Sequence, residues 1–142
     1  MLKQLDNGIF DMWIYQGHEF TDEQIGKYIG YVYLITNKTN NKKYIGKKLF
    51  WFSKTRTVKG KKKREKIVSD WKQYFSSSED LKKDVRELGE HNFIREILYL
   101  CNNKGTLSYL ELREQVDRRV LESDEYYNAF IGGKINKSHV KL

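Results

Sequence analysis

Two patterns of apolar and polar residues recur along the chain, one with the period of a strand and one with the period of a helix. Residues 31–36 are rich in β-branched and aromatic side chains, residues 37–42 are polar, and residues 43–46 resume the strand pattern. This order predicts a β-hairpin whose turn lies in the polar segment. The apolar run 93–100 has the length of a buried strand, and it predicts a third strand at the centre of the sheet.

Three further segments have capping residues or apolar residues at the spacing of a helix. Thr21 and Gln24 are spaced as a capping box for a short helix through Tyr28, which Gly30 ends. Ser76–Ser78 offer N-caps to a second helix, which Gly89 ends. The longest predicted helix covers residues 107–121, and its apolar face is expected to bury Tyr109, Leu112, Val116 and Val120. The combined elements predict an α+β fold, a small three-stranded antiparallel sheet flanked by helices.

Other segments lack a clear period. Residues 1–20 are expected to pack on the body as an irregular arm, and residues 49–63 to form an exposed basic loop before a helix that begins near Arg64. Residues 126–131 suit a closing strand or a turn. We therefore divide the chain into an N-terminal arm with a short helix (1–29), a folded domain (30–131) and a basic C-terminal tail (132–142).

Composition narrows the class of protein. The length of 142 residues suits one domain. The single cysteine, Cys101, excludes an intrachain disulfide and multi-cysteine zinc sites. We find neither an apolar run near the ~20 residues that span a bilayer nor the layout of a secretory signal. These features predict a cytoplasmic protein without a membrane partner.

The net charge of +8 is concentrated between residues 42 and 66. A positive field of this density attracts polyanions, most often phosphate backbones, although a lysine-rich loop can also be a solvated surface. In a flexible loop such lysines would follow a backbone rather than read bases. The candidate DNA-binding residues are Lys47, Lys54, Lys59, Lys61, Lys62, Lys63, Lys66 and Lys72.

The predicted hairpin carries a specific motif. Tyr31-Val32-Tyr33 is followed, after ten residues, by Tyr44-Ile45-Gly46. This resembles the paired motif of the GIY-YIG endonuclease family, with Tyr31 in the slot of the first glycine. A Ser-Ser helix start at 77–78, the strand at 93–100, Glu111 and Tyr127-Asn128 follow in the family's order, so the resemblance covers about residues 30–131.

The stretches 33–48 and 69–72 are similar to phage-encoded, stand-alone members of this family. The resemblance implies a GIY-YIG nuclease-like fold and a phage homing or DNA-processing endonuclease. Its partner would be double-stranded DNA in the cytoplasm of the host cell, and the protein would act as a monomer or a homodimer.

The resemblance also implies the chemistry of the site. The family assigns its hairpin tyrosines, here Tyr33 and Tyr44, to orienting or deprotonating water. A phenol with a pKa of ~10 is neutral at pH 7, so a phenolate needs a nearby cation such as Lys47 or Lys48. The metal-binding glutamate corresponds to Glu111, which would hold Mg²⁺ or Mn²⁺ together with water and phosphate oxygens.

The assignment of the remaining catalytic groups stays open. Glu114, one helical turn after Glu111, is an alternative metal ligand, and either carboxylate could simply pair with Arg113 or Arg118 on a solvated helix. The catalytic arginine is assigned first to Arg64 and then to Arg56, while Lys48 or Lys72 would substitute only as a point charge. Tyr74 lies where some relatives carry a proton-handling histidine. Asn128 is expected to have a structural role or to fix a catalytic side chain through its amide.

Two other functions compete with a Mg²⁺-dependent DNA endonuclease. A non-cleaving nucleic-acid-binding module would use the basic loop 54–66 but lose a tyrosine, arginine or glutamate of the motif, and none is missing. A different nuclease type uses a carboxylate-x-Lys triplet on a strand, whereas Asp80-Leu81-Lys82 lies just inside a predicted helix. The sequence therefore favours a phosphodiester hydrolase.

Overall fold

The predicted hairpin forms one edge of a larger sheet in the computed structural model, which describes residues 12–132 and 135–139. β3 (Gly30–Asn37) pairs antiparallel with β4 (Lys43–Leu49) on one side and with β7 (Phe93–Cys101) on the other. β1 (Trp13–Tyr15) runs parallel to β7, and β2 (His18–Glu19) closes the far edge. The order β2-β1-β7-β3-β4 makes β7 the central strand, as predicted.

The sheet has five strands and is mixed, so the prediction of three antiparallel strands was wrong. The expected irregular arm was also wrong for residues 13–15 and 18–19, which form β1 and β2. Strands of two or three residues are too short to show a period of two in the sequence. Their pairing depends on the free edge of β7, which lies about 80 residues later. Residues 1–11 lie outside the described residues.

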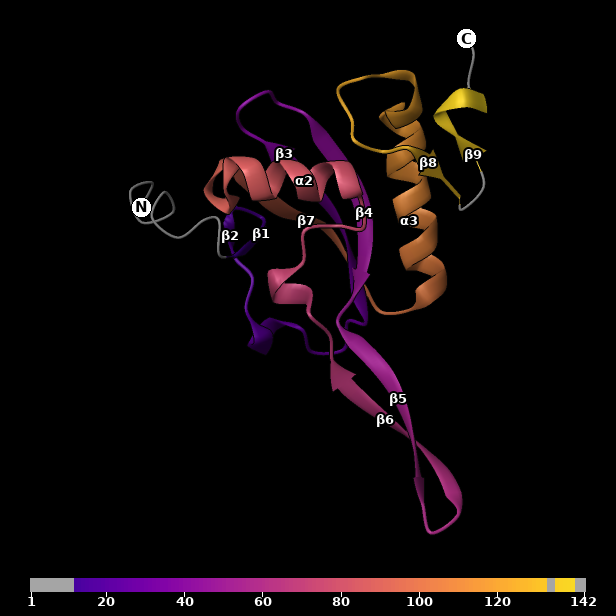
Figure 1. The fold of residues 1–142 in the computed structure, drawn as a ribbon. Coiled ribbons are helices and arrows are strands. Elements are labelled where there is room, and N and C mark those ends of the chain that lie inside the picture. The colour runs from indigo at the N-terminus through magenta and orange to yellow at the C-terminus, as the bar shows by residue number, and fades with distance from the viewer. Residues whose placement is uncertain (1–11, 133–134, 140–142) are drawn as a thin grey trace.

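Alternation along β3 divides the core between the two faces of the sheet. Tyr31, Tyr33 and Ile35 belong to an apolar cluster that includes side chains of α2 (Glu79–Leu88). Val32 and Leu34 belong to a second cluster on the side of α3 (Lys104–Asp117). Both helices lie beside the β3–β4 region in Figure 1. The predicted start of α2 is confirmed, because the Ser78 side chain accepts a hydrogen bond from the Leu81 amide.

α3 turns a different face to the sheet than its apolar pattern predicts. Tyr109, Leu112 and Val116 are exposed, whereas Leu107 and Gln115 are buried. Gln115 lies on the buried side of α3, where its Nε2 donates a hydrogen bond to the carbonyl of Ile45 in β4, at 3.2 Å. A buried polar residue weakens the contrast between an apolar and a polar helix face, and the prediction relied on that contrast.

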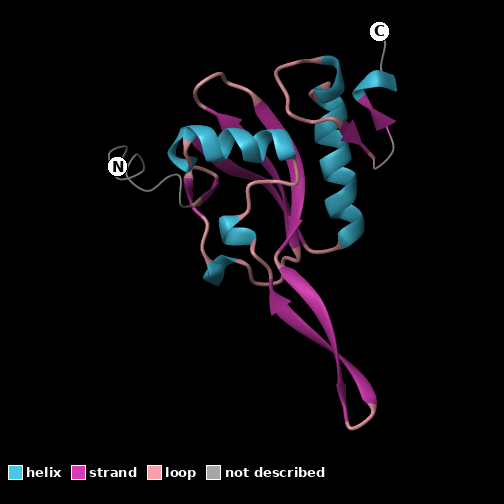
Figure 2. Ribbon diagram, in the orientation of Figure 1, coloured by secondary structure: helices cyan, strands magenta, loops and turns pink. Residues whose placement is uncertain are grey.

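The basic segment after β4 is a β-hairpin, so the predictions of a loop and of a helix near Arg64 were wrong. β5 (Trp51–Val58) and β6 (Lys61–Val68) pair in register over eight residue pairs. Lys59 and Gly60 connect them with φ values of 52° and 76°, the combination of a type I′ turn. We call this hairpin, residues 51–68, the basic arm, and it projects away from the rest of the molecule (Figures 1 and 2). The arm lacks a buried face, so apolar and polar residues do not alternate along it.

Short elements connect these parts. The capping box of Thr21 and Gln24 is confirmed, but the helix predicted after it is only the 3₁₀ turn η2 (Asp22–Gln24). Further 3₁₀ turns are η3 (Trp71–Gln73), η4 (Glu90–Asn92), η5 (Val120–Glu122) and η6 (Lys137–His139). β8 (Phe130–Ile131) pairs with β9 (Ile135–Asn136). No helix within the described ranges has the length and apolar character needed to cross a bilayer.

Tyr127 joins three separate parts of the chain through its hydroxyl group. It donates a hydrogen bond to Asp84 Oδ2 in α2, at 2.6 Å, and accepts one from Asn37 Nδ2 at the end of β3, at 2.9 Å. Burial raises the pKa of Tyr127 to about 12. The neutral phenol therefore holds the end of the motif hairpin against α2.

We predict that Tyr127→Phe destabilises the fold by about 1–3 kcal/mol, because the buried amide of Asn37 loses its acceptor. Tyr109→Phe removes the same atom from an exposed position and should change stability by less than about 0.5 kcal/mol. Urea unfolding of both variants measures the difference. Equal unfolding midpoints would contradict a stabilising role for this network.

Candidate active site

β4 is an edge strand. The main chain of Glu125 and Tyr127 pairs with its outer groups at Lys43, and side chains take up those at Ile45. Asn128 Oδ1 accepts from the amide of Ile45 at 3.0 Å, and Asn128 Nδ2 donates to the carbonyl of Ile45 at 2.8 Å. Ile45 lies between Tyr44 and Gly46. The amide of Asn128 therefore fixes the backbone that carries both motif residues, which agrees with the structural one of its two predicted roles.

Gly46 allows the ring of Tyr33 to lie directly over β4. The two residues are paired across β3 and β4. A Cβ atom at position 46 would lie 2.4 Å from the Tyr33 hydroxyl oxygen and 2.7 Å from Cε1 of Tyr44. Any side chain at this position would displace the tyrosine rings, so the glycine of the second motif is a steric requirement.

Three tyrosines meet on the α2 side of this edge. The rings of Tyr33 and Tyr44 stack with centroids 6.0 Å apart, and Tyr74 approaches Tyr33 edge-on at 6.0 Å. Tyr33 and Tyr74 share a hydrogen bond through their side chains. Tyr44 Oη lies 3.3 Å from Ser77 Oγ. The structure thus brings together all three tyrosines that the sequence singled out.

The environment of Tyr33 favours its neutral form. Burial raises the pKa of Tyr33 well above its ordinary value near 10, and Tyr44 and Tyr74 raise it further. Burial also raises the pKa of Tyr44, against the hydrogen bond of Ser77, which lowers it. The condition for a phenolate, a nearby cation that lowers the pKa, is therefore not met at Tyr33, which at neutral pH is a hydroxyl that donates or accepts hydrogen bonds.

Arg95, which the sequence analysis did not single out, holds Tyr74 in place. Its Nη1 donates to the carbonyls of Lys72, at 2.8 Å, and Tyr74, at 2.9 Å. The guanidinium carbon lies 4.3 Å from the ring centroid of Phe75, and the residue is 1% exposed. Arg95 is hidden in the apolar run of β7. Its only signal in the sequence is a charge at an inward-facing strand position.

Lys48 is the cation beside the tyrosines. Its Nζ lies 4.0 Å from the ring centroid of Tyr74 and 2.6 Å from Asp70 Oδ1. This hydrogen bond from Lys48 is the main cause that lowers the pKa of Asp70. The side chain of Lys48 is 11% exposed, so its charge acts on the tyrosine cluster with little screening by solvent.

Glu111 approaches the same strand from α3. Its Oε1 lies 3.9 Å from Lys47 Nζ, which donates its hydrogen bond instead to Ser108 Oγ, at 2.8 Å. Burial raises the pKa of Glu111, and Lys47 partly offsets this effect. A groove of about 490 Å³ is lined by Glu111 together with Tyr44, Lys47, Ser77 and Ser108, among others. Glu111 and Tyr44 therefore face one space.

Glu114 is engaged elsewhere. Its Oε1 accepts a hydrogen bond from Arg118 Nε at 3.3 Å, and it does not line the groove. Within the described part of the chain, no cluster of three or more His, Cys, Asp or Glu side chains could hold a metal ion. A partly buried carboxylate with a distant cation partner fits a hydrated divalent ion, for which water and substrate oxygens supply the other ligands.

Both candidate arginines lie on the basic arm, away from the tyrosines. Arg64 lies opposite Thr55 in the ladder of the basic arm, and Arg56 Nη2 lies 3.0 Å from Glu65 Oε1. Arg64 is four residues from the end of β6, which is roughly 13 Å along an extended strand. The arm also carries six of the candidate DNA-binding lysines, namely Lys54, Lys59, Lys61, Lys62, Lys63 and Lys66.

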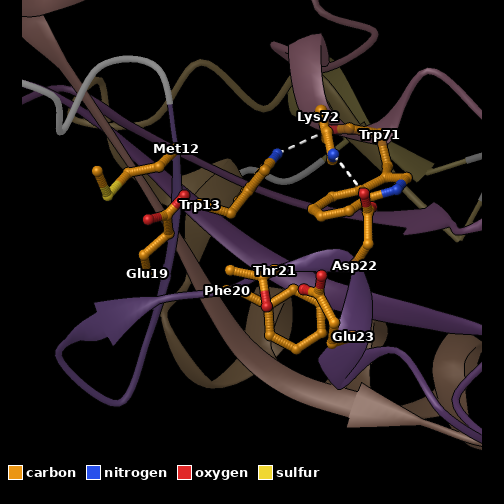
Figure 3. A pocket seen from close by; sticks show the side chains of 9 residues that line it. All are labelled: Met12, Trp13, Glu19, Phe20, Thr21, Asp22, Glu23, Trp71 and Lys72. Carbon is orange, nitrogen blue, oxygen red and sulfur yellow. Dashed lines mark hydrogen bonds and ion pairs between the residues drawn. The ribbon is translucent and has the colours of Figure 1, made fainter.

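Lys72 lies at a different cavity, of about 290 Å³, between β1 and η3. It forms an ion pair with Asp22 there, next to Trp13 and Phe20 (Figure 3). The Trp13 indole N–H donates to the carbonyl of Trp71 in the same place, at 2.7 Å. None of the tyrosines of the candidate site lines this cavity, which is part of the packing that anchors η3.

Comparison with known proteins identifies one family and one relative. Residues 13–131 match a family model described as "Putative endonuclease segE, GIY-YIG domain". The chain is 30% identical over 111 residues to a protein of Enterobacteria phage T4 described as "Putative endonuclease segD". That match covers 78% of this chain and 42% of the relative, so the chain spans about two fifths of the relative's length. No solved structure matches.

We predict that Gly46→Ala destabilises the fold by about 1–3 kcal/mol, because the new methyl group forces the ring of Tyr33 to move. Gly105→Ala is the matched control, since its Cβ would meet only Asn103 Oδ1, at 3.5 Å, and alanine favours the helix. Urea unfolding compares the two variants. A neutral Gly46→Ala would contradict the close approach of Tyr33.

Proposed function

The chain belongs to the GIY-YIG domain family of putative endonucleases, and we propose that it is a metal-dependent endonuclease that hydrolyses phosphodiester bonds in double-stranded DNA. One observation supports this most strongly: Glu111, Tyr44 and Lys47 line one groove at the edge of β4. A carboxylate, a hydroxyl group and a cation are the groups that phosphodiester hydrolysis requires. In a phage this activity would serve homing or DNA processing.

Each group of the groove has a distinct task in the proposed reaction. Glu111 would hold Mg²⁺ or Mn²⁺, which would supply positive charge against the charge that develops on the phosphate. Lys47, tied to Ser108 and only loosely to Glu111, is free to approach a phosphate oxygen. Tyr44 orients the attacking water through its hydroxyl group, which Ser77 holds in position.

Tyr33 and Lys48 support this reaction from the tyrosine cluster. The raised pKa of Tyr33, which burial causes, argues for a neutral hydroxyl that relays hydrogen bonds rather than for a phenolate base. Lys48 supplies the positive charge for which Arg64 and Arg56 were first considered, since both arginines lie on the basic arm. Tyr74 contacts both Lys48 and Tyr33.

The same placement of the arginines favours a second candidate, a non-cleaving DNA-binding module. The basic arm contains eight Lys or Arg residues and one Glu, which is seven of the eight net positive charges of the chain. Such a module would bind DNA through the arm without using the groove. The cleavage assay separates the two functions.

We predict that the protein cleaves supercoiled plasmid in Mg²⁺ and that EDTA abolishes cleavage. Glu111→Gln and Tyr33→Phe should each lower the rate at saturating DNA by at least about a hundredfold, because both groups act in the transition state. Glu114→Gln, the matched control, should remain active. Undiminished cleavage in EDTA contradicts metal dependence, and an inactive Glu114→Gln with an active Glu111→Gln would move the metal ligand by one turn. A wild type that binds but does not cleave would favour the second candidate.

The arm generates a prediction about binding. If its lysines contact about four phosphates, they contribute about −3.6 to the slope of log affinity against log salt, at ~0.9 per phosphate. Replacing Lys59, Lys61, Lys62, Lys63 and Lys66 by Gln should flatten the slope by that amount. A salt titration of duplex binding in EDTA measures it, and an unchanged slope would place the DNA on another surface.

A further inference from the structure

The basic arm has the geometry of an ordered ribbon. Eight residue pairs follow one another in regular register between β5 and β6. From Phe52 to Thr57 and from Lys59 to Arg64 every residue is exposed. The two strands extend clear of both helices and of the main sheet, and they twist around each other (Figure 2). The register therefore assigns each charge of the arm to one of its two faces, which an unpaired loop would not do.

The two faces of the ribbon differ in chemistry. Residues paired across an antiparallel ladder share a face, and successive pairs alternate between faces. One face, which we call the hydroxyl face, combines three hydroxyl groups with three cations: Ser53, Thr55, Thr57, Lys62, Arg64 and Lys66. The only carboxylate of the arm, Glu65, lies on the opposite face, where it pairs with Arg56. The hydroxyl face therefore offers an anion or a base edge no repulsive group.

The free arm contains one like-charge pair that a polyanion would relieve. Arg56 and Lys63 are directly paired across the ladder, and like charges in this position destabilise a hairpin. A two-stranded hairpin without a packed face is itself only marginally stable in water. A sequence that maintains both features on a projecting ribbon indicates a negatively charged partner along its length.

The dimensions of the ribbon fit the major groove of duplex DNA. The groove is about 12 Å wide and admits a two-stranded ribbon, whose strands lie ~4.8 Å apart. Eight residues span roughly 26 Å, about three quarters of a helical turn. Arginine recognises guanine O6 and N7 in this groove, and Ser and Thr hydroxyls bond to any base edge.

We propose that the basic arm enters the major groove of duplex DNA with its hydroxyl face toward the bases and reads sequence there, Arg64 contacting a guanine. The cations of the opposite face, led by Arg56 and Lys63, lie nearer the flanking phosphates. The inference rests on the proposed function for the choice of duplex DNA as partner. It adds to that function a surface that selects where the protein binds.

The test is a selection of binding sites from a randomised duplex in EDTA, with the full chain. The expected result is an enriched sequence with a guanine at a fixed position. Dimethyl sulfate footprinting should then show protection of guanine N7, in the major groove, and none of adenine N3, in the minor groove. Absence of any enriched sequence, or protection of adenine N3 alone, would overturn the proposal.

Two matched variants test the assignment of the faces. Arg64→Gln and Arg56→Gln each remove one arginine from the exposed arm, and circular dichroism should show both folded. Arg64→Gln should reduce the preference for the fixed guanine roughly 5- to 150-fold, whereas Arg56→Gln should weaken binding to all sequences alike. Equal preferences in the two variants would overturn the assignment of Arg64.

The outcome is separable from that of the proposed function, because EDTA removes cleavage from this measurement. A protein that cleaves plasmid but enriches no sequence overturns the inference and leaves the nuclease intact. A protein that enriches a sequence but never cleaves supports sequence recognition by the basic arm and contradicts the proposed nuclease activity.

Discussion

The closure of the outer edge of β4 is the constraint on which the candidate site depends. An edge strand leaves amide and carbonyl groups unpaired, and in a partly buried position these groups need partners. Asn128 and Gln115 supply partners to Ile45 with single side chains instead of a further strand. This solution keeps the backbone rigid and leaves space beside it, and the groove with Glu111 and Tyr44 occupies that space.

The same edge strand places a lysine on each face of the sheet. Side chains alternate along β4, so Lys48 lies with the tyrosines while its neighbour Lys47 lies with Glu111 and Ser108 on α3. Gly46, between Ile45 and Lys47, leaves room for the ring of Tyr33. Residues 45–48 of β4 thus contact both the tyrosine cluster on one face of the sheet and the groove with Glu111 on the other side.

The sequence predicted the elements that short-range signals specify. The β3–β4 hairpin, the strand β7 and the cap of α2 depend on neighbouring residues, and they were found as expected. β1 and β2 depend on a distant partner strand, and the arm has no apolar face, so neither leaves a local signal. The grouping of Tyr33, Tyr44 and Tyr74 followed from the family resemblance. Arg95, which ties down the backbone of Tyr74, could not be found, because a buried charge in an apolar run looks like an interruption.

The uneven placement of charge makes the molecule a strong electric dipole. The arm carries seven of the eight net charges, so the remaining body, with the groove, is close to neutral. In the field of a polyanion such a molecule experiences a torque before any contact forms, and its positive end arrives first. The body then approaches in an orientation set by the arm, which restricts the search for a productive encounter to rotations about one axis. In the proposed function, attraction of the DNA therefore belongs to the arm and hydrolysis to the groove of the body.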